Sequence, residues 1–343
     1  MPKTKKAGGA AERRQRLLDL TVGKWVSQAI SVCAELGIAD ILKDGPRSAA
    51  EIATITGASE DAMFRLLRAL ASLGLLSSEA QHFALTEIGE YLRSDISGSL
   101  RGWARSVGHD MTWRPWGELA HSVRTGKPAF DHVFGEPTFE YLRRNADAAA
   151  ILNEAMTSIS SIDACAVVEA YDFSSIGTLV DVGGGHGLLL ATVLRANQSV
   201  RGVLYELPHA IDGAAALLKR EGVADRCEIM SGDFFRSVPE GGDAYMMKLV
   251  IHDWDSDRAL QILRNCHRAM RASSRLIVVD CVLQPGDEPD PGKFIDLNML
   301  VMTTGGRERC EPEFRDLFAK AGFELTRIVP TATPKSVIEG VRL

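Results

Sequence analysis

Residues 179–187 read Leu-Val-Asp-Val-Gly-Gly-Gly-His-Gly, an apolar strand followed by a turn with almost no side chains. Glycine lets the backbone adopt positive φ angles and lets a ligand approach it closely. A dinucleotide fold requires G-x-G-x-x-G, but counting from Gly183 the last position of that pattern is Leu188. The glycines fit D-x-G-x-G-x-G over residues 181–187 instead. The stretch predicts either a ligand-binding turn of another class or an ordinary tight turn between a strand and a helix.

Beyond residue 170 short β-rich runs alternate with helical ones, which predicts an α/β fold with a doubly wound, mostly parallel sheet. The last two strands are close in sequence and predict an antiparallel edge. The seven expected strands are Thr178–Val182, Gly202–Tyr205, Cys227–Met230, Tyr245–Val250, Leu276–Val282, Glu324–Ile328 and Val337–Arg342.

The first third of the chain has helical periodicity and predicts an all-α, winged-helix-like domain. Ser48 and Glu51 form a capping box, a second helix begins near Ser59, and residues 75–85 suit a small hairpin. This layout raises DNA binding as one hypothesis. The second helix begins with Glu60 and Asp61, which repel phosphates, so packing against a second subunit is the preferred interpretation.

These patterns divide the chain into a basic flexible tail (1–16), the winged-helix-like domain (17–100), a helical linker and substrate-pocket region (101–170) and the sheet domain (171–343). The linker region is dense in aromatic residues, and Trp113 among them is a candidate for the wall of a substrate pocket.

Composition indicates a globular protein, with 45% hydrophobic and 24% charged residues among 343. A net charge of -6 disfavours nucleic acid as the main partner. No uninterrupted apolar run approaches the roughly 18 to 20 residues of a membrane span, and the N-terminus does not resemble a signal peptide. The six cysteines form no C-x-x-C pair, so reduced thiols and a cytoplasmic location are expected.

Polar residues follow the first four predicted strands of the sheet domain. In an open α/β sheet, ligands bind beyond the carboxyl ends of the strands. Glu206 can accept hydrogen bonds from ribose hydroxyls, and Asp233 can accept from an adenine amino group while Phe234 covers the ring. Lys248 and His252 follow at the fourth strand. Their joint placement indicates one nucleoside-binding site.

With these residues in place, the chain resembles the class I S-adenosylmethionine-dependent small-molecule O-methyltransferases of the plant caffeate and bacterial polyketide or hydroxyneurosporene type. The resemblance covers nearly the whole chain. The matching segments are residues 181–187, 206–208, 232–234, 248–254 and Gly-Gly-Arg-Glu-Arg at 305–309.

The resemblance implies a homodimer formed through the N-terminal domain, S-adenosylmethionine as cofactor, no metal and His252 as general base. Asp280 and Glu308 fall where the family has two acids flanking that histidine; plant members have glutamate in place of Asp280, which leaves its contact with His252 open. The implied cofactor-binding residues are Asp181, Gly183, Gly185, Glu206, Gly232, Asp233, Phe234 and Lys248. The positions expected to line the acceptor pocket, besides Trp113, are Asn153, Met156, Met299 and Thr303.

The expected reaction is methyl transfer to a hydroxyl of an aromatic or polyketide-like small molecule. A phenol of pKa about 10 facing a histidine of about 6.5 leaves a gap of roughly 3.5 units, or about 5 kcal/mol. An acid beside His252 would raise the pKa of the histidine and select its tautomer. Two alternatives stay open: a relative that uses the cofactor in hydroxylation or decarboxylation, and a winged-helix DNA-binding regulator.

Overall fold

The computed structural model describes residues 9–208 and 210–343, which pack as two compact units. The N-terminal unit comprises the chain up to Arg114 together with Leu142–Ile159. The sheet unit comprises Pro115–Tyr141 and Ser160–Leu343. The two units therefore share the region 101–170 that was expected to be a single linker.

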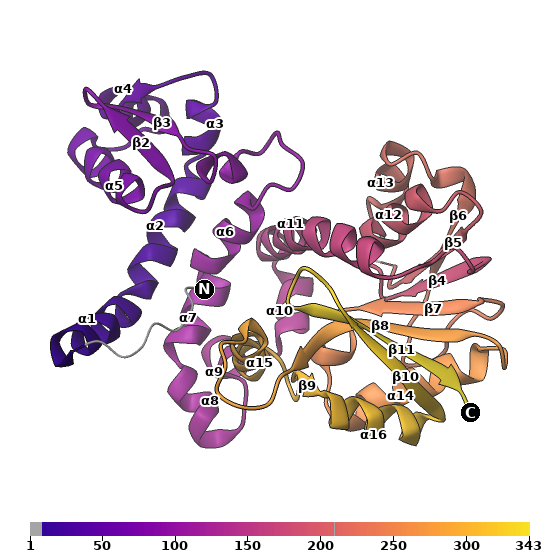
Figure 1. Ribbon diagram of the computed structural model, residues 1–343. Coiled ribbons are helices and arrows are strands. Elements are labelled where there is room, and N and C mark those ends of the chain that lie inside the picture. The colour runs from indigo at the N-terminus through magenta and orange to yellow at the C-terminus, as the bar shows by residue number, and fades with distance from the viewer. Residues whose placement is uncertain (1–8, 209) are drawn as a thin grey trace. The chain divides into compact units, whose positions relative to one another are not determined.

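The N-terminal unit is mainly helical and carries a small sheet of order β1-β3-β2 (Figure 1). Its elements are α1 (Ala10–Thr21), α2 (Gly23–Glu35), α3 (Ile38–Leu42), β1 (Arg47–Ser48), α4 (Ala49–Thr56), α5 (Glu60–Ser72), β2 (Leu76–Glu79), β3 (His82–Leu85), η1 (Gly89–Leu92) and α6 (Arg101–Gly108). Helix α7 (Asp110–Gly117), α10 (Thr138–Arg144) and α11 (Ala146–Ala170) each contribute residues to both units.

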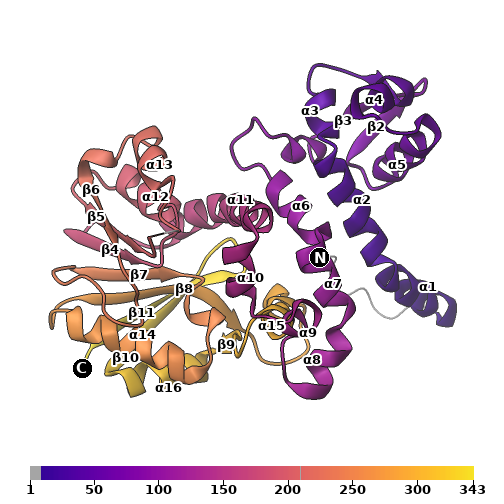
Figure 2. The same ribbon diagram turned by 180° about the vertical axis from the view of Figure 1, so that it is seen from behind.

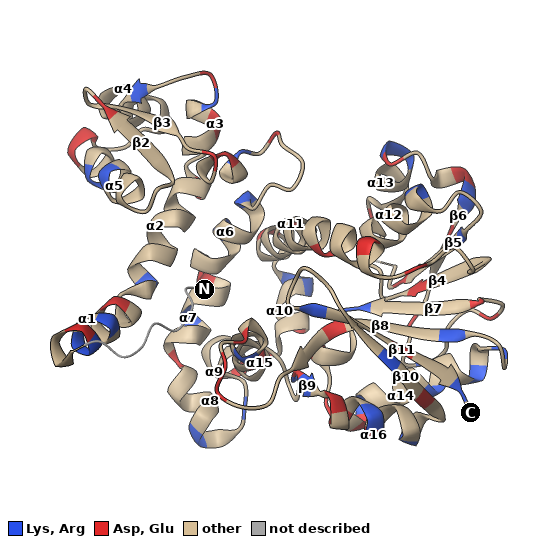
Figure 3. Ribbon diagram, viewed as in Figure 1, with Lys and Arg blue, Asp and Glu red and all other residues tan. Residues whose placement is uncertain are grey.

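The predicted winged-helix layout is confirmed. Ser48 and Glu51 form both bonds of a capping box at α4, and α5 follows Ser59. The expected hairpin pairs β2 with β3, and the two-residue β1, which the sequence did not predict, adds a third strand beside β3. Helix α5 carries both acidic and basic residues (Figure 3), rather than the cluster of basic residues that is typical of a DNA-binding helix.

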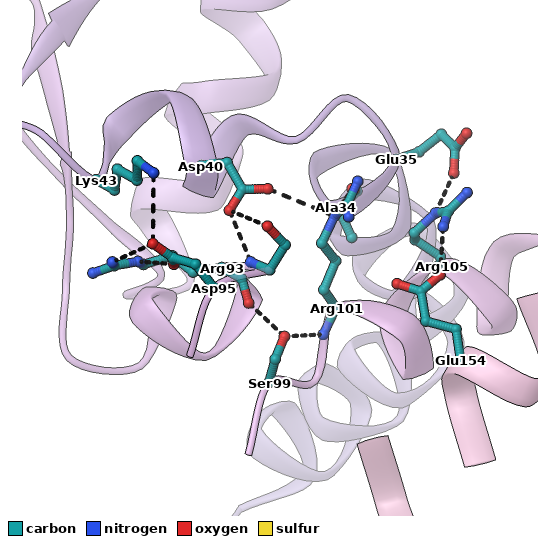
Figure 4. Close-up of polar contacts among 11 residues, drawn as sticks. Ala34, Glu35, Asp40, Lys43, Arg93, Asp95, Ser99, Arg101, Arg105 and Glu154 are labelled. Carbon is teal, nitrogen blue, oxygen red and sulfur yellow. Dashed lines mark hydrogen bonds and ion pairs between the residues drawn. The ribbon is translucent and has the colours of Figure 1, made fainter. Parts of the chain in front are cut away.

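A polar network connects helices of the N-terminal unit (Figure 4). The Arg105 guanidinium donates to Glu35 on α2 at 2.7 Å and to Glu154 on α11 at 2.5 Å. Gly102 on α6 lies so close to Glu154 that a Cβ there would come within 2.7 Å of its backbone. Helices α2, α6 and the first part of α11 are therefore held together by both ion pairs and close packing.

The sheet unit contains the predicted seven-stranded sheet, with order β10-β11-β8-β7-β4-β5-β6. The strands are β4 (Thr178–Val182), β5 (Arg201–Glu206), β6 (Cys227–Ser231), β7 (Ala244–Lys248), β8 (Arg275–Leu283), β10 (Phe323–Pro330) and β11 (Lys335–Arg342), and a two-residue strand β9 (Arg309–Cys310) pairs with the end of β8. Strands β4 to β8 are parallel, whereas β11 and β10 run antiparallel, as expected.

Helices cover both faces of this sheet, and the two ribbon views agree on the layers (Figures 1 and 2). On one face α12 (Leu188–Ala196) and α13 (Ala214–Arg220) pack with Ala164 and Val167 of α11. On the other face α14 (Ser256–Ala269) and α16 (Glu311–Ala321) pack with the 0% exposed Tyr245. The other helical elements of this unit are α8 (Leu119–Thr125), α9 (Ala129–Phe134), η2 (Ala224–Arg226), η3 (Ile251–Asp253) and α15 (Pro291–Met302).

The structure corrects two expected boundaries. Strand β7 ends at Lys248 rather than Val250, because Leu249 has a positive φ of 54° that breaks the extended backbone. A flexible tail was expected over residues 1–16. Residues 1–8 lie outside the described residues, whereas residues 10–16 belong to α1, because its alanines, leucines, glutamate and arginines favour a helix.

Among the described residues, one helix, α11, has the length and mean hydropathy of a membrane span, although charged and polar residues interrupt its apolar sequence. Those two criteria are also met by helices of a protein core. Ala164 and Val167 of α11 are buried in the core beside the sheet, at 1% and 0% exposure. This part of α11 therefore packs within the protein, and 33% of its apolar window is buried.

Candidate active site

The glycine turn after β4 forms an open stretch of backbone. Gly183, Gly185 and Gly187 have φ angles of 71°, 58° and 81°, which side chains disfavour. A Cβ at Gly183 would lie 2.9 Å from Val250, whereas a Cβ at Gly185 would meet no heavy atom within 4 Å. The turn therefore packs closely against Val250 at Gly183, but its backbone is open at Gly185, where a ligand could approach it.

Glu206 and Asp181 both lie next to this turn but differ in their surroundings. The Glu206 carboxylate accepts from the amides of Gly185 at 3.0 Å and Leu207 at 2.7 Å, and each oxygen retains a lone pair for a ligand hydroxyl. Asp181 is 1% exposed. Burial raises the pKa of its carboxyl to about 7, although Lys248 opposes the shift.

The segment after β6 places an acid beside an aromatic cluster. Asp233 accepts the amide of Phe235 at 2.9 Å, and its side chain is 36% exposed. The Phe234 ring packs against Phe235 with centroids 5.0 Å apart and against the edge of Trp254. Gly232 is required here because a Cβ would overlap the hydroxyl of Tyr205. An acceptor and an aromatic ring are therefore adjacent in this segment, and their contact with an adenine ring stays a prediction.

Lys248, the last residue of β7, belongs to a buried cluster that the sequence does not reveal. Its ammonium donates to Ser160 on α11 at 3.0 Å and lies 4.0 Å from Asp163. Lys335 on β11 lies 3.7 Å from the same Asp163 carboxylate. Burial lowers the pKa of Lys248, and Asp163 opposes the shift. The spacing of Ser160 and Asp163 on one face of a helix is the signal that could have identified them.

His252 lies on η3, just beyond β7, and is 7% exposed. Its Nδ1 is 2.7 Å from Glu308 Oε1, and its Nε2 is 3.6 Å from Asp253 Oδ1. Burial alone would lower the pKa of the histidine, but Asp253, Glu308 and Asp280 outweigh it and raise the pKa to about 9. Because a carboxylate can only accept, Nδ1 carries the proton donated to Glu308, which leaves Nε2 as the proton acceptor.

Asp280 lies near His252 without bonding to it. Its carboxylate is 0% exposed, and among the described residues neither oxygen has a hydrogen-bond partner. Burial raises its pKa to about 7, while His252 and Arg309 oppose the shift and Glu308 adds to it. The aspartate therefore acts on the histidine through its charge rather than through a direct contact.

Further residues around the histidine come from α15 and the loop after it. Thr303, 9% exposed, donates its hydroxyl to the carbonyl of the buried Met299 at 2.8 Å. Asp296 accepts the amide of Glu308 at 2.9 Å, and Arg309 is 2% exposed. The sequence assigned no role to Arg309, although it is the last residue of the matched segment 305–309, and gave no signal for Asp296 on α15.

The remaining predicted pocket residues belong to the N-terminal unit. Trp113 is half-buried on α7, while Asn153 and Met156 are exposed on the first part of α11. Their expected contact with an acceptor stays a prediction, as does metal independence. Within the described ranges 9–208 and 210–343, no group of three His, Cys, Asp or Glu side chains could hold a metal ion.

Two family models match the chain. Residues 116–324 match an O-methyltransferase domain, and residues 18–95 match an O-methyltransferase dimerisation domain. The chain therefore belongs to the O-methyltransferase family, and its winged-helix-like domain corresponds to a dimerisation domain rather than to a DNA-binding one.

Individual relatives extend over nearly the whole chain. A phenazine O-methyltransferase of Lysobacter antibioticus is 42% identical over 96% of this chain and 97% of its own length. The mitomycin biosynthesis 6-O-methyltransferase of Streptomyces lavendulae is 39% identical over 98% and 97%. The structure of an O-methyltransferase from neocarzinostatin biosynthesis, in complex with S-adenosylmethionine and a naphthoic acid, has a TM-score of 0.77 at 33% identity, covering 93% of this chain and 96% of the other.

The protein is an S-adenosylmethionine-dependent O-methyltransferase of the class found in secondary metabolism. Its own residues fit that cofactor. The backbone at Gly185 is open, the Glu206 carboxylate beside it has unused acceptor capacity, and Asp233 is partly exposed beside an aromatic face.

Proposed function

We propose that the protein methylates a hydroxyl oxygen of an aromatic or polyketide-like small molecule, with His252 as the general base. The observation that supports this most directly is the 2.7 Å contact between His252 Nδ1 and Glu308 in a buried environment. This contact orients the imidazole and leaves Nε2 to receive a proton.

The electrostatics of the site favour proton transfer from a phenol. With a pKa of about 9, His252 lies about one unit below a phenol of pKa about 10, which is about 1.4 kcal/mol rather than the about 5 kcal/mol of an ordinary histidine. The same shift keeps most of the histidine protonated at neutral pH, so activity should rise as the pH approaches 9.

We propose that S-adenosylmethionine is held by the glycine turn and by residues that follow the neighbouring strands, among them Gly183, Gly185, Glu206 and Lys248. When bound, it supplies an activated methyl group and a sulfonium charge. Glu206 would accept from hydroxyls, and the open glycine backbone would permit close approach. The proposed cofactor site also includes Asp181, Gly232, Asp233 and Phe234. The Asp181 carboxyl lies against the backbone of the turn at Gly184.

The test is turnover with a panel of hydroxylated aromatic compounds, measured as release of S-adenosylhomocysteine. Methylated product from the wild type and a large loss in His252→Ala would support the proposal. Cofactor binding without methylation across the panel would favour the alternative of hydroxylation or decarboxylation.

A second candidate function is N-methylation, because one relative, 34% identical over 330 residues, is named an N,N-dimethyltransferase. An aromatic amine is already neutral and nucleophilic at neutral pH, so it needs no base before transfer. Removal of His252 should then cost little. The Glu308-oriented histidine favours the hydroxyl acceptor.

We also propose a homodimer formed through the N-terminal unit. Apolar residues of α1 and α2 are unusually exposed, at 63% for Leu17, 70% for Leu20 and 66% for Trp25. Such a patch marks an interaction surface, and it borders or lies in the matched dimerisation domain. Light scattering should give twice the chain mass for the wild type and a monomer for a Leu17→Glu, Leu20→Glu double variant; a monomeric wild type would refute the dimer.

We also propose a cytoplasmic location, which the six free cysteines support.

A further inference from the structure

Residues 307–309 bind the turn that carries His252 at several points. The amide of Arg307 donates to the His252 carbonyl at 2.7 Å, and Glu308 binds the imidazole ring. The guanidinium of Arg309 donates to the carbonyl of Ile251 at 3.0 Å and to that of Trp254 at 2.9 Å. One side chain thus bridges both ends of the turn.

The turn has little stability of its own. Its internal bonds, from the amides of Asp253 and Trp254, are long at 3.3 and 3.4 Å. Leu249, just before it, has a positive φ of 54°, a conformation that costs roughly 1–2 kcal/mol in a residue with a side chain. Strained backbone of this kind persists only where the surroundings hold it in place. The contacts from residues 307–309 are shorter than the turn's own, and those of Arg309 carry a charge.

Arg309 is also placed to balance buried negative charge. It is 2% exposed on β9, next to the end of β8. Its positive charge opposes the rise in the pKa of the 0% exposed Asp280, whose oxygens have no hydrogen-bond partner among the described residues. The charged groups that face His252 and Arg309 are Asp253 on η3, Asp280 on β8, Arg307 and Glu308 in the preceding loop, and Glu313 on α16.

We infer that Arg309 is a positioning residue for the methyl-transfer reaction: its guanidinium holds the 251–254 turn so that His252 keeps its ring against Glu308. This inference rests on the proposed role of His252 as base. A lysine could not replace the arginine, because one ammonium on a flexible stem cannot bridge two carbonyls in a fixed plane.

The test compares Arg309→Lys with Arg226→Lys. Arg226 also binds main-chain carbonyls, those of Leu194, Asn197 and Val200. It precedes β6, whereas His252 follows the parallel strand β7, so the two residues lie at opposite ends of the parallel strands. Arg226→Lys therefore controls for the loss of a structural guanidinium. Thermal unfolding and calorimetric binding of S-adenosylmethionine establish that each variant is folded.

The readout independent of activity is the ¹⁵N NMR titration of histidine-labelled protein, with His252 assigned by its absence in His252→Gln. In Arg309→Lys we expect the His252 pKa to fall toward 6.5 and its Nδ1–H signal to weaken, and kcat to fall on the order of 100-fold with KM for the cofactor nearly unchanged. Arg226→Lys should leave the His252 pKa and Nδ1–H signal as in the wild type, and kcat within about twofold of the wild-type value. If Arg309→Lys does not accumulate as folded protein, Arg309→Gln retains one amide donor and takes its place.

An unchanged His252 signal in the Arg309 variant would overturn the inference, as would an equal change in both variants. A perturbed His252 signal with unchanged kcat would support the role of Arg309 in holding the turn and would refute His252 as the base. Failure of the inference and failure of the proposed function are thereby distinguished.

Discussion

The contact between Glu308 and His252 makes a quantitative prediction about pH dependence. Glu308→Gln keeps the shape of the side chain and removes its charge. The pKa of His252 is about 9 in the wild type, raised by Asp253, Glu308 and Asp280 against the effect of burial. A hydrogen bond to a charged group contributes roughly 1.5–3 kcal/mol, equivalent to roughly 1 to 2 pKa units. The substitution should lower the pKa of His252 to roughly 7 to 8.

The assay is kcat/KM for S-adenosylhomocysteine formation between about pH 5.5 and 10.5, because this ratio reports the ionisation of the free enzyme. A general base works unprotonated, so activity rises with pH up to the pKa of His252. The rising limb should level off near pH 9 in the wild type and at lower pH in Glu308→Gln. The maximal rate should be lower in the variant, because a weaker base accepts the proton less readily.

Two controls separate the histidine from other ionisations. A more acidic phenol moves a limb caused by the substrate but leaves one caused by His252 in place. Glu311→Gln removes an exposed carboxylate that pairs with Arg315 on α16 and should leave the profile unchanged. A limb at the same pH in the wild type and Glu308→Gln, or a wild-type limb near 6.5, would refute the reasoning.

Four further substitutions give expected outcomes. His252→Ala should lower kcat by about 10²- to 10⁴-fold with the cofactor Kd nearly unchanged, and equal losses of both would contradict the assigned role. Glu206→Ala should instead raise the cofactor Kd roughly 10- to 100-fold in calorimetry, since it removes two acceptor oxygens beside the glycine turn. The pKa of Asp181 is raised by burial from 3.8 to about 7, so the buried carboxyl lowers the stability of the folded protein increasingly as the pH rises from about 4 to 7. Asp181→Asn removes this effect. Its free energy of unfolding in urea, relative to that of the wild type, should increase over that pH range by up to roughly 4 kcal/mol and then level off. Gly183→Ala should lower Tm, because its Cβ would lie 2.9 Å from Val250 at a φ of 71°, and an unchanged Tm would show that the turn tolerates a side chain.

The elements that the sequence predicts best are those with a strong local signal. Strands β4, β5, β7 and β8 are mostly buried runs rich in apolar residues, and parallel strands bring their carboxyl ends together, so Glu206, Asp233 and Lys248 can be assigned to one region from the sequence. The capping box at Ser48 has a similarly local origin. The short β1 was missed because two residues carry no periodicity.

The residues that sequence reasoning missed are brought to the site by tertiary structure. Asp163 on α11 and Lys335 on β11 meet Lys248 from elements far apart in the sequence. Arg309 follows a predicted acid and has no periodic signal of its own; only the path of the loop shows that it binds the carbonyls of the His252 turn. The absence of a bond between Asp280 and His252 likewise depends on distances that no pattern contains.

The most direct test of the account is to incubate wild-type protein and His252→Ala with S-adenosylmethionine labelled with ¹³C in its methyl group and a panel of hydroxylated aromatic compounds. Mass spectrometry and ¹³C NMR of the products then locate the transferred methyl group. We expect an aromatic O-¹³CH₃ signal with the wild type, and its near loss in a His252→Ala protein that still binds the cofactor. A methyl group on nitrogen alone, or equal O-methylation by both proteins, would contradict the central claim that His252 activates a hydroxyl acceptor.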